Sequence, residues 1–331
     1  VTDIPNQTIL EDATFATISL NDFVSDAETS DADIVWTYSG NTNLTVSITN
    51  QVATITTPLN WNGNETITFT ATDTGDGADA TTNANDSSVF TVTAVNDEPV
   101  AADVNGSGSE AGTITTTLTA TDVESTSGVT FSIVAQPTYK TANVSIATPT
   151  YSSGTFSAVA TYTHDGSETT SDSFTYKAND GSADSNVATA TITITAVNDA
   201  PVAANVNGSG NEAGTITTTL TATDVDNSDP SSFPFSIISN PTNITGSVSI
   251  GSVSYSAGTF TANATYTHDG SETTSDSFTY KANDGSADSN VATATITITA
   301  VNDAPVAANV NGNGDNNATI TTTLTATDAD H

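Results

Sequence analysis

The stretch from Phe174 to Pro201, FTYKANDGSADSNVATATITITAVNDAP, decides the fold of this chain. Its apolar residues alternate with polar ones in two runs, first Phe174, Tyr176 and Ala178, then Ala190, Ile192, Ile194 and Ala196. A period of two places alternate side chains on opposite faces of a β-strand. An acidic loop with Asp180 and Asp184 separates the runs. We therefore expect two strands that end a domain, followed by a connector, Val197–Pro201.

This stretch returns letter for letter at residues 278–305, within a longer identity between 160–208 and 264–312. The connector Val-Asn-Asp-x-Pro occurs at 95–99, 197–201 and 301–305, and residues 1–5 are a variant of it. Proline fixes φ and lacks an N–H donor, so each connector is expected to be an extended boundary. The predicted domains are repeat 1 at 1–97, repeat 2 at 98–199, repeat 3 at 200–303 and an incomplete start of repeat 4 at 304–331.

The same alternation continues inside each repeat. Examples are Ile67, Phe69 and Ala71; Phe90, Val92 and Ala94; Ile114, Leu118 and Ala120; and Phe156, Ala158, Ala160 and Tyr162. The intervening residues are mostly Thr and Ser, which suit half-exposed pleated surfaces. Seven or so short strands per repeat, separated by Gly, Asn, Asp and Pro turns, predict an all-β tandem array of seven-stranded Greek-key β-sandwiches of the immunoglobulin type.

The last segment, 304–331, contains sequence for about two strands, and an isolated strand pair is marginally stable in water. Either the natural chain continues past His331, or a neighbouring chain completes this sheet. The segment restarts the repeat in register, which favours continuation.

The composition excludes several classes of function. There are 38 acidic residues, 29 of them Asp, against three lysines and no arginine, for a formal net charge of −35. Nucleic-acid phosphates and anionic membrane surfaces require basic residues, so neither is an expected partner. The chain has no cysteine, and none of its apolar runs approaches the ~20 residues that span a bilayer. We expect no disulfide, no thiolate chemistry and no membrane insertion in this segment.

Acidic residues concentrate at four places in the repeat. The first is the connector, and the second is a Glu thirteen residues after its Asp, for which Glu11 is the looser equivalent in the first repeat. The third is an acid-x-acid pair at the far end of the following strand, and the fourth is the set of later loops. The members are Asn96, Asp97, Asn198, Asp199, Asn302 and Asp303; Glu11, Glu110 and Glu212; Asp26, Glu28, Asp122, Glu124, Asp224, Asp226, Asp328 and Asp330; and Asp73, Asp165, Glu168, Asp180, Asp269, Glu272 and Asp284.

Strands of a sandwich run from pole to pole, so loops from alternate turns should gather these acids beside the connectors. Clustered carboxylates repel one another and raise each other's pKa unless a cation compensates. Oxygen-only ligands are typical of calcium rather than zinc, and magnesium demands stricter geometry. Any single Asp or Asn is equally well explained as a turn residue. The recurrence of the whole set in register with the connector favours calcium.

Two motifs then resemble a known family. EAGTITTTLTATDVES (110–125) and EAGTITTTLTATDVDN (212–227) resemble the start of a cadherin repeat, and SFTYKANDGSADSNVATATITITAVNDAP resembles its end. The repeats are similar to bacterial cadherin-like and VCBS-type tandem repeats of large surface adhesins. Repeat 1, with LNDFVSDAE and NWNGNETITFTATD, looks like a related Ig-like module. The resemblance covers essentially the whole chain.

Cadherin repeats bind calcium between successive domains, and the resemblance implies ligands at three junctions. They are Glu11, Asn96, Asp97, Asp122, Glu124 and Asp180 at the first; Glu110, Asp165 or Glu168, Asn198, Asp199, Asp224, Asp226 and Asp284 at the second; and Glu212, Asp269 or Glu272, Asn302, Asp303, Asp328 and Asp330 at the third. The connectors lack the family's leading Asp, and Asn316 replaces the strand-preceding Glu in the last segment. Fewer ions per junction than in cadherins are therefore expected.

The remaining reactive residues offer little for catalysis. His164 and His268 occupy one repeat position beside a turn Asp, so they are interpreted as surface residues rather than members of a triad. Lys177 and Lys281 are expected to pair with nearby acids, the alternative being a Lys–Asn or Lys–Asp isopeptide cross-link. Trp36 and Trp61 are expected in the core, the alternative being a carbohydrate-stacking surface.

The predicted function is non-enzymatic. The sequence indicates an extracellular or cell-surface adhesive segment, a rod stiffened by calcium at its junctions. Its expected partners are neighbouring repeats of the same chain and an unidentified surface or glycan ligand. The alternative is a subunit of a self-assembling extracellular filament, in which a copy of the chain completes the last segment.

Overall fold

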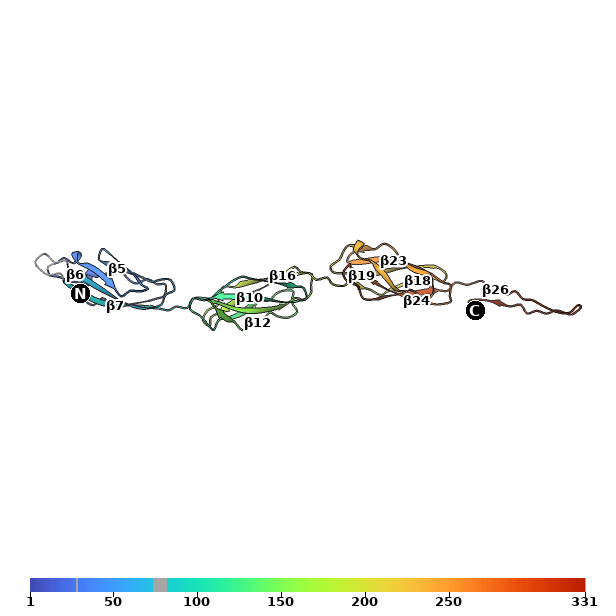
Figure 1. The fold of residues 1–331 in the computed structure, drawn as a ribbon, viewed down its shortest axis with the longest axis horizontal. Helices are drawn as coiled ribbons and strands as arrows, with labels where there is room; N and C mark the ends of the chain where they lie inside the picture. Colours follow the sequence, from blue (N-terminus) through green and yellow to red (C-terminus); the bar gives the residue numbers. More distant parts are fainter. Residues whose placement is uncertain (28, 74–81, 331) are drawn as a thin grey trace. The chain divides into compact units, whose positions relative to one another are not determined.

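The computed structural model describes residues 1–27, 29–73 and 82–330. The chain divides into two compact units: unit 1 comprises 1–108, 112–165 and 171–193, and unit 2 comprises 109–111, 166–170 and 194–331. The described residues form pairs of stacked β-sheets, which confirms the predicted tandem array of sandwiches (Figure 1). Three short 3-10 helices interrupt the strands: η1 (Leu20–Phe23), η2 (Asp31–Asp33) and η3 (Pro230–Ser232).

The first sandwich contains seven strands in two sheets of order β1-β7-β6-β3 and β2-β5-β4. They are β1 (Gln7–Leu10), β2 (Ile18–Ser19), β3 (Val35–Ser39), β4 (Thr45–Thr49), β5 (Val52–Thr56), β6 (Gly63–Thr72) and β7 (Asn83–Thr93). The first strand pairs with the last in parallel, whereas the other pairs are antiparallel. The connector therefore leaves from a strand that lies beside the start of its repeat.

The second sandwich has sheets of order β12-β14-β10-β8, with β13 also on β14, and β11-β15-β16-β9. Its strands are β8 (Val100–Ala101), β9 (Val104–Ser109), β10 (Thr113–Thr121), β11 (Thr130–Ala135), β12 (Ser145–Ile146), β13 (Thr150–Ser152), β14 (Thr155–Thr163), β15 (Ser171–Asn179) and β16 (Ala188–Thr195). Here the first strand is split between the two sheets. The split, together with short strands before β14, raises the strand number above the predicted seven.

The third sandwich repeats this arrangement as β17-β19-β23-β21, with β22 on β23, and β18-β25-β24-β20. Its strands are β17 (Val202–Ala203), β18 (Val206–Asn211), β19 (Thr215–Thr223), β20 (Phe235–Ser239), β21 (Ile244–Ile250), β22 (Ser254–Ser256), β23 (Thr259–His268), β24 (Ser275–Ala282) and β25 (Ala292–Thr299). The last segment contributes one short pair, β26 (Val306–Ala307) with β27 (Ala326–Thr327).

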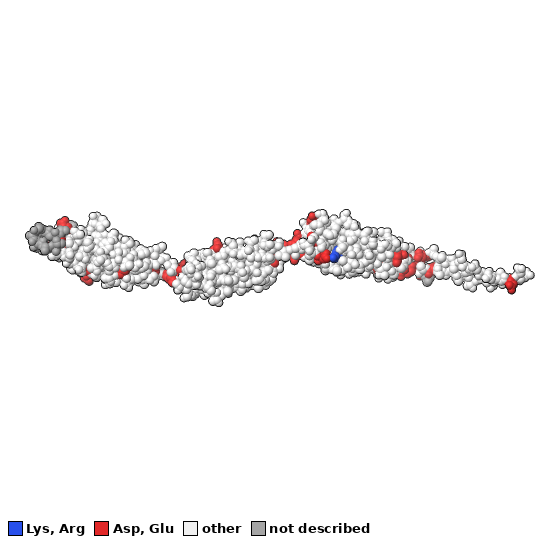
Figure 2. Space-filling model, in the orientation of Figure 1, with Lys and Arg blue, Asp and Glu red and all other residues white. Residues whose placement is uncertain are grey.

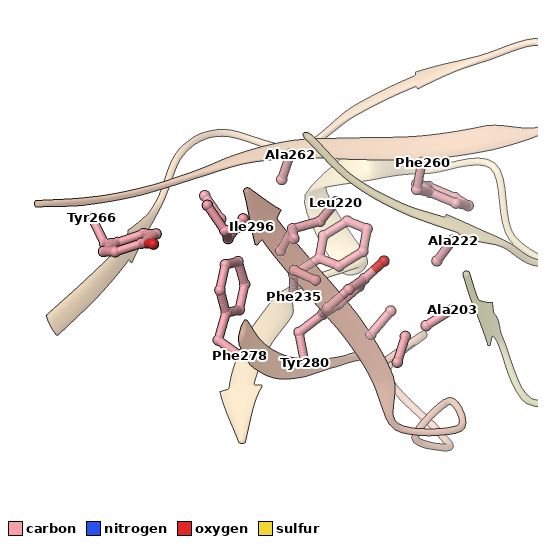
Figure 3. Close-up of a cluster of buried hydrophobic side chains, with 14 of the residues drawn as sticks. Ala203, Leu220, Ala222, Phe235, Phe260, Ala262, Tyr266, Phe278, Tyr280 and Ile296 are labelled. Atoms are coloured by element: carbon pink, nitrogen blue, oxygen red, sulfur yellow. The ribbon is translucent and has the colours of Figure 1, made fainter. Parts of the chain in front are cut away.

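The core of the third sandwich is built by the predicted alternation. Leu220 and Phe260 come from one sheet and meet Phe278, Tyr280 and Ile296 from the other (Figure 3). Each fully buried aliphatic or aromatic side chain contributes about 1.5–3 kcal/mol through the hydrophobic effect. Buried alanines, among them Ala222, Ala262 and Ala294, complete this core.

The deciding stretch forms β15 and β16 as expected, with Phe174, Tyr176, Ala190 and Ile192 buried. The alternation stops earlier than the sequence indicates. Ala94 and Ala196 are exposed, because the chain leaves the sheet at Thr93 and Thr195 and its next residues belong to the connector.

A carboxylate near the start of one central strand holds a loop in each sandwich. Glu65 accepts hydrogen bonds from the backbone N–H groups of Thr42, Asn43 and Leu44. Asp172 accepts from the N–H groups of Thr138 and Tyr139, and Asp276 from those of Thr242 and Asn243. The three acids occupy the same position in their sheets. Glu65, Asp172 and Asp276 pair across the sheet with Phe90, Ile192 and Ile296, and each of these three partners lies six residues before a connector Asn.

Burial acts to raise the pKa of Glu65 and of Asp172, but the backbone hydrogen bonds outweigh it and hold both pKa values below their ordinary range. Replacing Asp172 by Asn should therefore lower the free energy of unfolding by about 2 kcal/mol at pH 7, the usual cost of losing charged hydrogen bonds. The difference from the natural chain should shrink as the pH falls below about 3.9, the ordinary pKa of Asp, and should vanish once the pH has passed the lowered pKa of Asp172 in the folded chain.

Hydrogen exchange of the Thr138 and Tyr139 amides would measure this effect at the loop. Asp315→Asn makes the same charge change in the last segment, where the residue is exposed, and should leave both amides protected. Equal protection in Asp172→Asn and the natural chain would show that the loop does not depend on this carboxylate.

Candidate metal centres at the connectors

A tight turn after the first long strand presents one glutamate in each complete repeat. Glu11 follows β1, Glu110 follows β9 and Glu212 follows β18. The next residue has a positive φ in every case: 61° at Asp12, 50° at Ala111 and 51° at Ala213. Such a backbone is uncommon for residues other than glycine, so its recurrence shows that the turn itself is a repeated feature. All three glutamate side chains are at least nine-tenths buried.

Carboxylates hold the backbone of each connector. The N–H of Val95 donates to Glu11 at 3.0 Å, and that of Val301 donates to Glu212 at 3.0 Å. Two residues later, the N–H of Asp97 donates to Glu124 at 2.9 Å. The same bond joins Asp199 to Asp226 at 2.6 Å and Asp303 to Asp330 at 2.5 Å. Each connector is thus held by an acid of the preceding repeat, an acid of the following repeat, or both.

The acid-x-acid pair is shaped by its first member. Asp122 accepts hydrogen bonds from the N–H groups of Glu124 and Ser125, and Asp224 accepts from those of Asp226 and Asn227. This local turn chemistry is common for Asp. It directs the second acid of the pair to the connector, as the sequence predicts.

The connector asparagine links the site to the later acidic loop. Asn96 donates to Asp180 at 2.9 Å, and Asn198 donates to Asp284 at 2.8 Å. Backbone N–H groups of the loop also donate to Asp180 and Asp284. Hydrogen bonds from Ala183, Asn96 and Ser182 lower the pKa of Asp180. Burial raises the pKa of Asp284, but the corresponding bonds outweigh it, and the net shift is downward.

Three carboxylates converge at the second connector. Oxygens of Glu110, Glu168 and Asp226 lie within 4.8 Å of one another, and the same spacing holds for Glu212, Glu272 and Asp330 at the third. The loop carrying Glu168 lies on the glutamate turn, since a Cβ on Gly166 would be 3.6 Å from the Cβ of Ala111. Figure 2 shows that acidic side chains in unit 2 gather at the ends of the third sandwich. These groups can hold a metal ion.

The unsatisfied atoms fit a cation. Within the described residues, every buried carboxylate oxygen that lacks a hydrogen-bond partner belongs to a predicted ligand at a connector: Glu11 Oε1, Asp97 Oδ2, Glu110 Oε2, Asp122 Oδ2, Glu212 Oε2 and Asp224 Oδ2. A buried oxygen without a hydrogen-bond partner lowers the free energy of unfolding by roughly 1–3 kcal/mol, and a charged oxygen lowers it by more. The donor set contains oxygen only, which fits a hard divalent cation.

The electrostatics of Glu168 and Glu272 differ from those of the other acids. Partial desolvation, together with the negative charges of Asp226, Glu110 and Asp199, raises the pKa of Glu168. Desolvation and the charges of Glu212, Asp330 and Asp303 likewise raise the pKa of Glu272. The two glutamates therefore resist ionisation next to neighbours that are already charged.

Several predicted site residues lie elsewhere or act differently. Asp269 accepts hydrogen bonds from the N–H and hydroxyl groups of Ser271, so Glu272 rather than Asp269 reaches the three-carboxylate group. Asp165 likewise lies outside the group that contains Glu168. In the first repeat Asp26 accepts from the N–H of Thr29, whose hydroxyl donates to Asp73. Glu28 lies outside the described residues.

The interpretation of the histidines as surface residues is wrong. His164 and His268 are each 1% exposed. His268 uses both ring nitrogens in its own loop, because Nδ1 accepts from the N–H of Gly270 and Nε2 pairs with the Thr273 hydroxyl. A sequence with Asp and Gly after the histidine indicates an exposed turn, but it does not reveal that the ring folds back beneath that turn.

The lysines and tryptophans agree with their simpler interpretations. Lys177 pairs with Asp184 and Lys281 with Asp288, and Asn179 and Asn283 also donate to these two acids. The pairs hold the loops that present Asp180 and Asp284. Trp36 is buried in the first core and Trp61 packs against it, half-buried. Both therefore contribute to packing in the first sandwich.

Two segments of the chain match models of protein families. Residues 198–300 match the family described as bacterial cadherin-like domain, and residues 96–195 match the family described as bacterial Ig domain. These matches confirm the resemblance to bacterial cadherin-like and Ig-like repeats, although the Ig model matches repeat 2, which the sequence motifs indicate as cadherin-like. No curated protein matches the chain. Among the described residues, no helix has the length and apolar character needed to cross a membrane.

Solved structures share the fold at low sequence identity. The protocadherin gamma B4 extracellular domain matches with a TM-score of 0.52 and 19% identity over 99% of this chain and 54% of that one. Protocadherin gamma B2 cadherin domains 1–5 match with a TM-score of 0.51 and 16% identity, over 99% of this chain and 66% of that one. This chain thus spans between about half and two thirds of their lengths, and the likeness shows the fold alone.

The raised pKa of Glu168 predicts how metal-free protein responds to pH. Its contribution to stability should be present below about pH 4.5 and lost as the pH rises through its raised pKa, because ionisation then adds a charge to an already negative site. In the presence of chelator, Glu168→Gln should remove the loss of stability that ionisation of Glu168 causes as the pH rises. The melting temperature of the variant should therefore exceed that of the natural chain at pH 7 but not at pH 4.

Thermal melts across pH 4–8 with chelator would measure this difference, and Glu98→Gln is a matched control because Glu98 is an exposed acid outside the three-carboxylate groups. If Glu98→Gln produced the same change as Glu168→Gln, total charge rather than the local group would be responsible.

Proposed function

We propose that the chain is a segment of a secreted or cell-surface adhesive protein whose repeats are joined rigidly by calcium. The observation that carries this proposal is the set of unpartnered buried carboxylate oxygens, all of which lie at predicted ligands beside the connectors. The repeat boundaries proposed are 1–97, 98–199 and 200–303, with a fourth repeat beginning at 304. The matched families contain structural domains, which supports a non-enzymatic role.

The proposed ligands combine both sides of each connector. At the second junction Glu110 and Glu168 belong to the preceding repeat, Asn198 and Asp199 to the connector, and Asp224, Asp226 and Asp284 to the following repeat. The corresponding sets are Glu11, Asn96, Asp97, Asp122, Glu124 and Asp180 at the first junction, and Glu212, Glu272, Asn302, Asp303, Asp328 and Asp330 at the third. Extracellular modules bind calcium with Kd values of about 10⁻⁴–10⁻³ M, so millimolar external calcium would be sufficient.

The proposed mechanism is electrostatic. Without a cation, carboxylates of two repeats repel one another across the connector, and the two repeats reorient easily. A bound calcium ion supplies positive charge that all of these carboxylates share. The connector N–H groups are already fixed by Glu11, Glu124, Asp226 and Asp330, so the connector is shaped for that arrangement.

Calcium should raise the melting temperature and lengthen the particle in small-angle X-ray scattering, and excess chelator should reverse both changes. Magnesium at the same concentration is the control, because it retains its waters and wants octahedral geometry. Identical scattering and melting with calcium and with chelator would refute the proposal.

Replacing Asp199 by Ala should loosen the second junction alone. The chain has no native cysteine, so spin labels can be attached at Thr45→Cys, Ser152→Cys and Ser256→Cys, all exposed positions in the three sandwiches. Calcium should narrow the distribution of label-to-label distances in both the 45–152 pair and the 152–256 pair. Asp199→Ala should abolish the narrowing in the 152–256 pair only. Asp103→Ala is the control, because Asp103 accepts its hydrogen bond from Thr189 within the second repeat. Loss of both narrowings with Asp199→Ala would contradict the ligand assignment.

The filament alternative has one supporting observation. Ile320 and Leu324 are 53% and 82% exposed, whereas Ile216 and Leu220 at the same repeat positions are buried. Further strands would cover them, and a second copy of the chain is one source. Electron micrographs of purified protein distinguish the two functions, because fibres that lengthen with concentration require the second copy, and separate particles of uniform length favour the adhesive segment.

A further inference from the structure

The third carboxylate of each group has an equivalent position at the first connector. Glu168 lies four residues before Asp172, and Glu272 lies four residues before Asp276. Asp172 and Asp276 correspond to Glu65 in both strand register and hydrogen bonding. The residue four positions before Glu65 is Trp61. Trp61 therefore occupies, in the first repeat, the place of Glu168 and Glu272.

The loop before Trp61 still reaches the glutamate turn. The N–H of Asn60 donates to Asp12, the residue after Glu11, at 3.2 Å. The indole of Trp61 packs against the apolar core of the first sandwich, however, and brings no charge to the connector. Among residues 1–27, 29–73 and 82–330, the three-carboxylate groups occur at the second and third connectors and not at the first.

The first connector shares several features with the second. Glu11 Oε1, Asp97 Oδ2 and Asp122 Oδ2 are buried without partners, as are Glu110 Oε2 and Asp224 Oδ2 at the second. Glu124 accepts from Asp97 just as Asp226 accepts from Asp199. The first connector thus retains the shared ligands but lacks the third carboxylate that Glu168 and Glu272 supply. It has acids where the second connector has alanines, Glu98 for Ala200 and Asp12 for Ala111, but neither acid belongs to a three-carboxylate group among the described residues.

We propose that the junctions respond to calcium in steps, the second and third becoming fixed at lower calcium than the first because Glu168 and Glu272 each add a carboxylate there. Calcium affinity depends on the number of charged ligands, and one added carboxylate should lower the Kd on the order of tenfold. The inference rests on the proposed function and assigns Glu168, Glu272 and Trp61 as the residues that set the order.

The test is a calcium chloride titration of the full chain carrying the spin-label pairs 45–152 and 152–256. The midpoint, which is the calcium concentration at which half of the narrowing has occurred, should be on the order of tenfold lower for the 152–256 pair than for the 45–152 pair. Glu168→Gln should raise the 152–256 midpoint to that of 45–152, with the 45–152 midpoint unchanged. Asp315→Asn, the same charge change at an exposed site of the last segment, should alter neither midpoint by as much. Glu168 is exposed, so the variant should keep the circular dichroism of the natural chain.

Equal midpoints for the two pairs in the natural chain would overturn the stepwise response but leave calcium fixation standing. An unchanged 152–256 midpoint in Glu168→Gln would overturn the role of that carboxylate. A chain in which neither pair responds to calcium would refute both the inference and the proposed function on which it rests.

Discussion

The connectors are held by hydrogen bonds from their backbone N–H groups to carboxylates. A connector lies outside the sheets, so its N–H groups need partners other than a neighbouring strand. Glu11 and Glu124 supply them for Val95 and Asp97. A carboxylate has more acceptor sites than one N–H can fill. The second oxygen of Glu11, together with oxygens of Asp97 and Asp122, is left buried and unpartnered beside the first connector.

Little positive charge is available to balance those oxygens. The chain has three lysines and no arginine, and two of the lysines are already paired with Asp184 and Asp288. The surroundings of the acids differ, because hydrogen bonds lower the pKa of Asp180, whereas desolvation and neighbouring negative charges raise that of Glu168. Asp180 is surrounded by N–H donors, whereas Glu168 is surrounded by acids. A divalent cation beside the connector would offset the repulsion between Glu168 and the neighbouring acids without disturbing the hydrogen bonds that Asp180 accepts.

The sandwiches could be predicted from sequence because their determinant is local. Alternation of Phe174, Tyr176 and Ala178 fixes one face of one strand, and the repeat supplies the same information again. Strand ends were less predictable, since Ala94 and Ala196 continue the alternation after the sheet has ended. The carboxylates Glu65, Asp172 and Asp276 gave no sequence signal for their role, because their partners are backbone N–H groups of a distant loop. The burial of His164 and His268 was hidden for a similar reason: a turn sequence does not show which side chain folds beneath it.

The site was predictable to the level of the loop but not always of the residue. The connector, the glutamate and the acid-x-acid pair come together as their spacing predicts. Within HDGSE, spacing could not separate Asp165 from Glu168, since both lie in one short loop. In the equivalent loop the shorter acid, Asp269, bonds to its own turn, and the longer acid, Glu272, extends to its neighbours.

Each carboxylate cluster takes its members from the end of one repeat, the connector and the start of the next. Neither repeat alone carries a whole cluster, but a copy of repeat 2 or repeat 3 placed before another repeat supplies the glutamates that complete one. Insertion or deletion of a complete repeat therefore restores an intact joint at the new boundary, and the identity between 160–208 and 264–312 spans one such boundary. A chain built in this way can change its length over evolution by whole repeats without any new residue having to be selected at its joints.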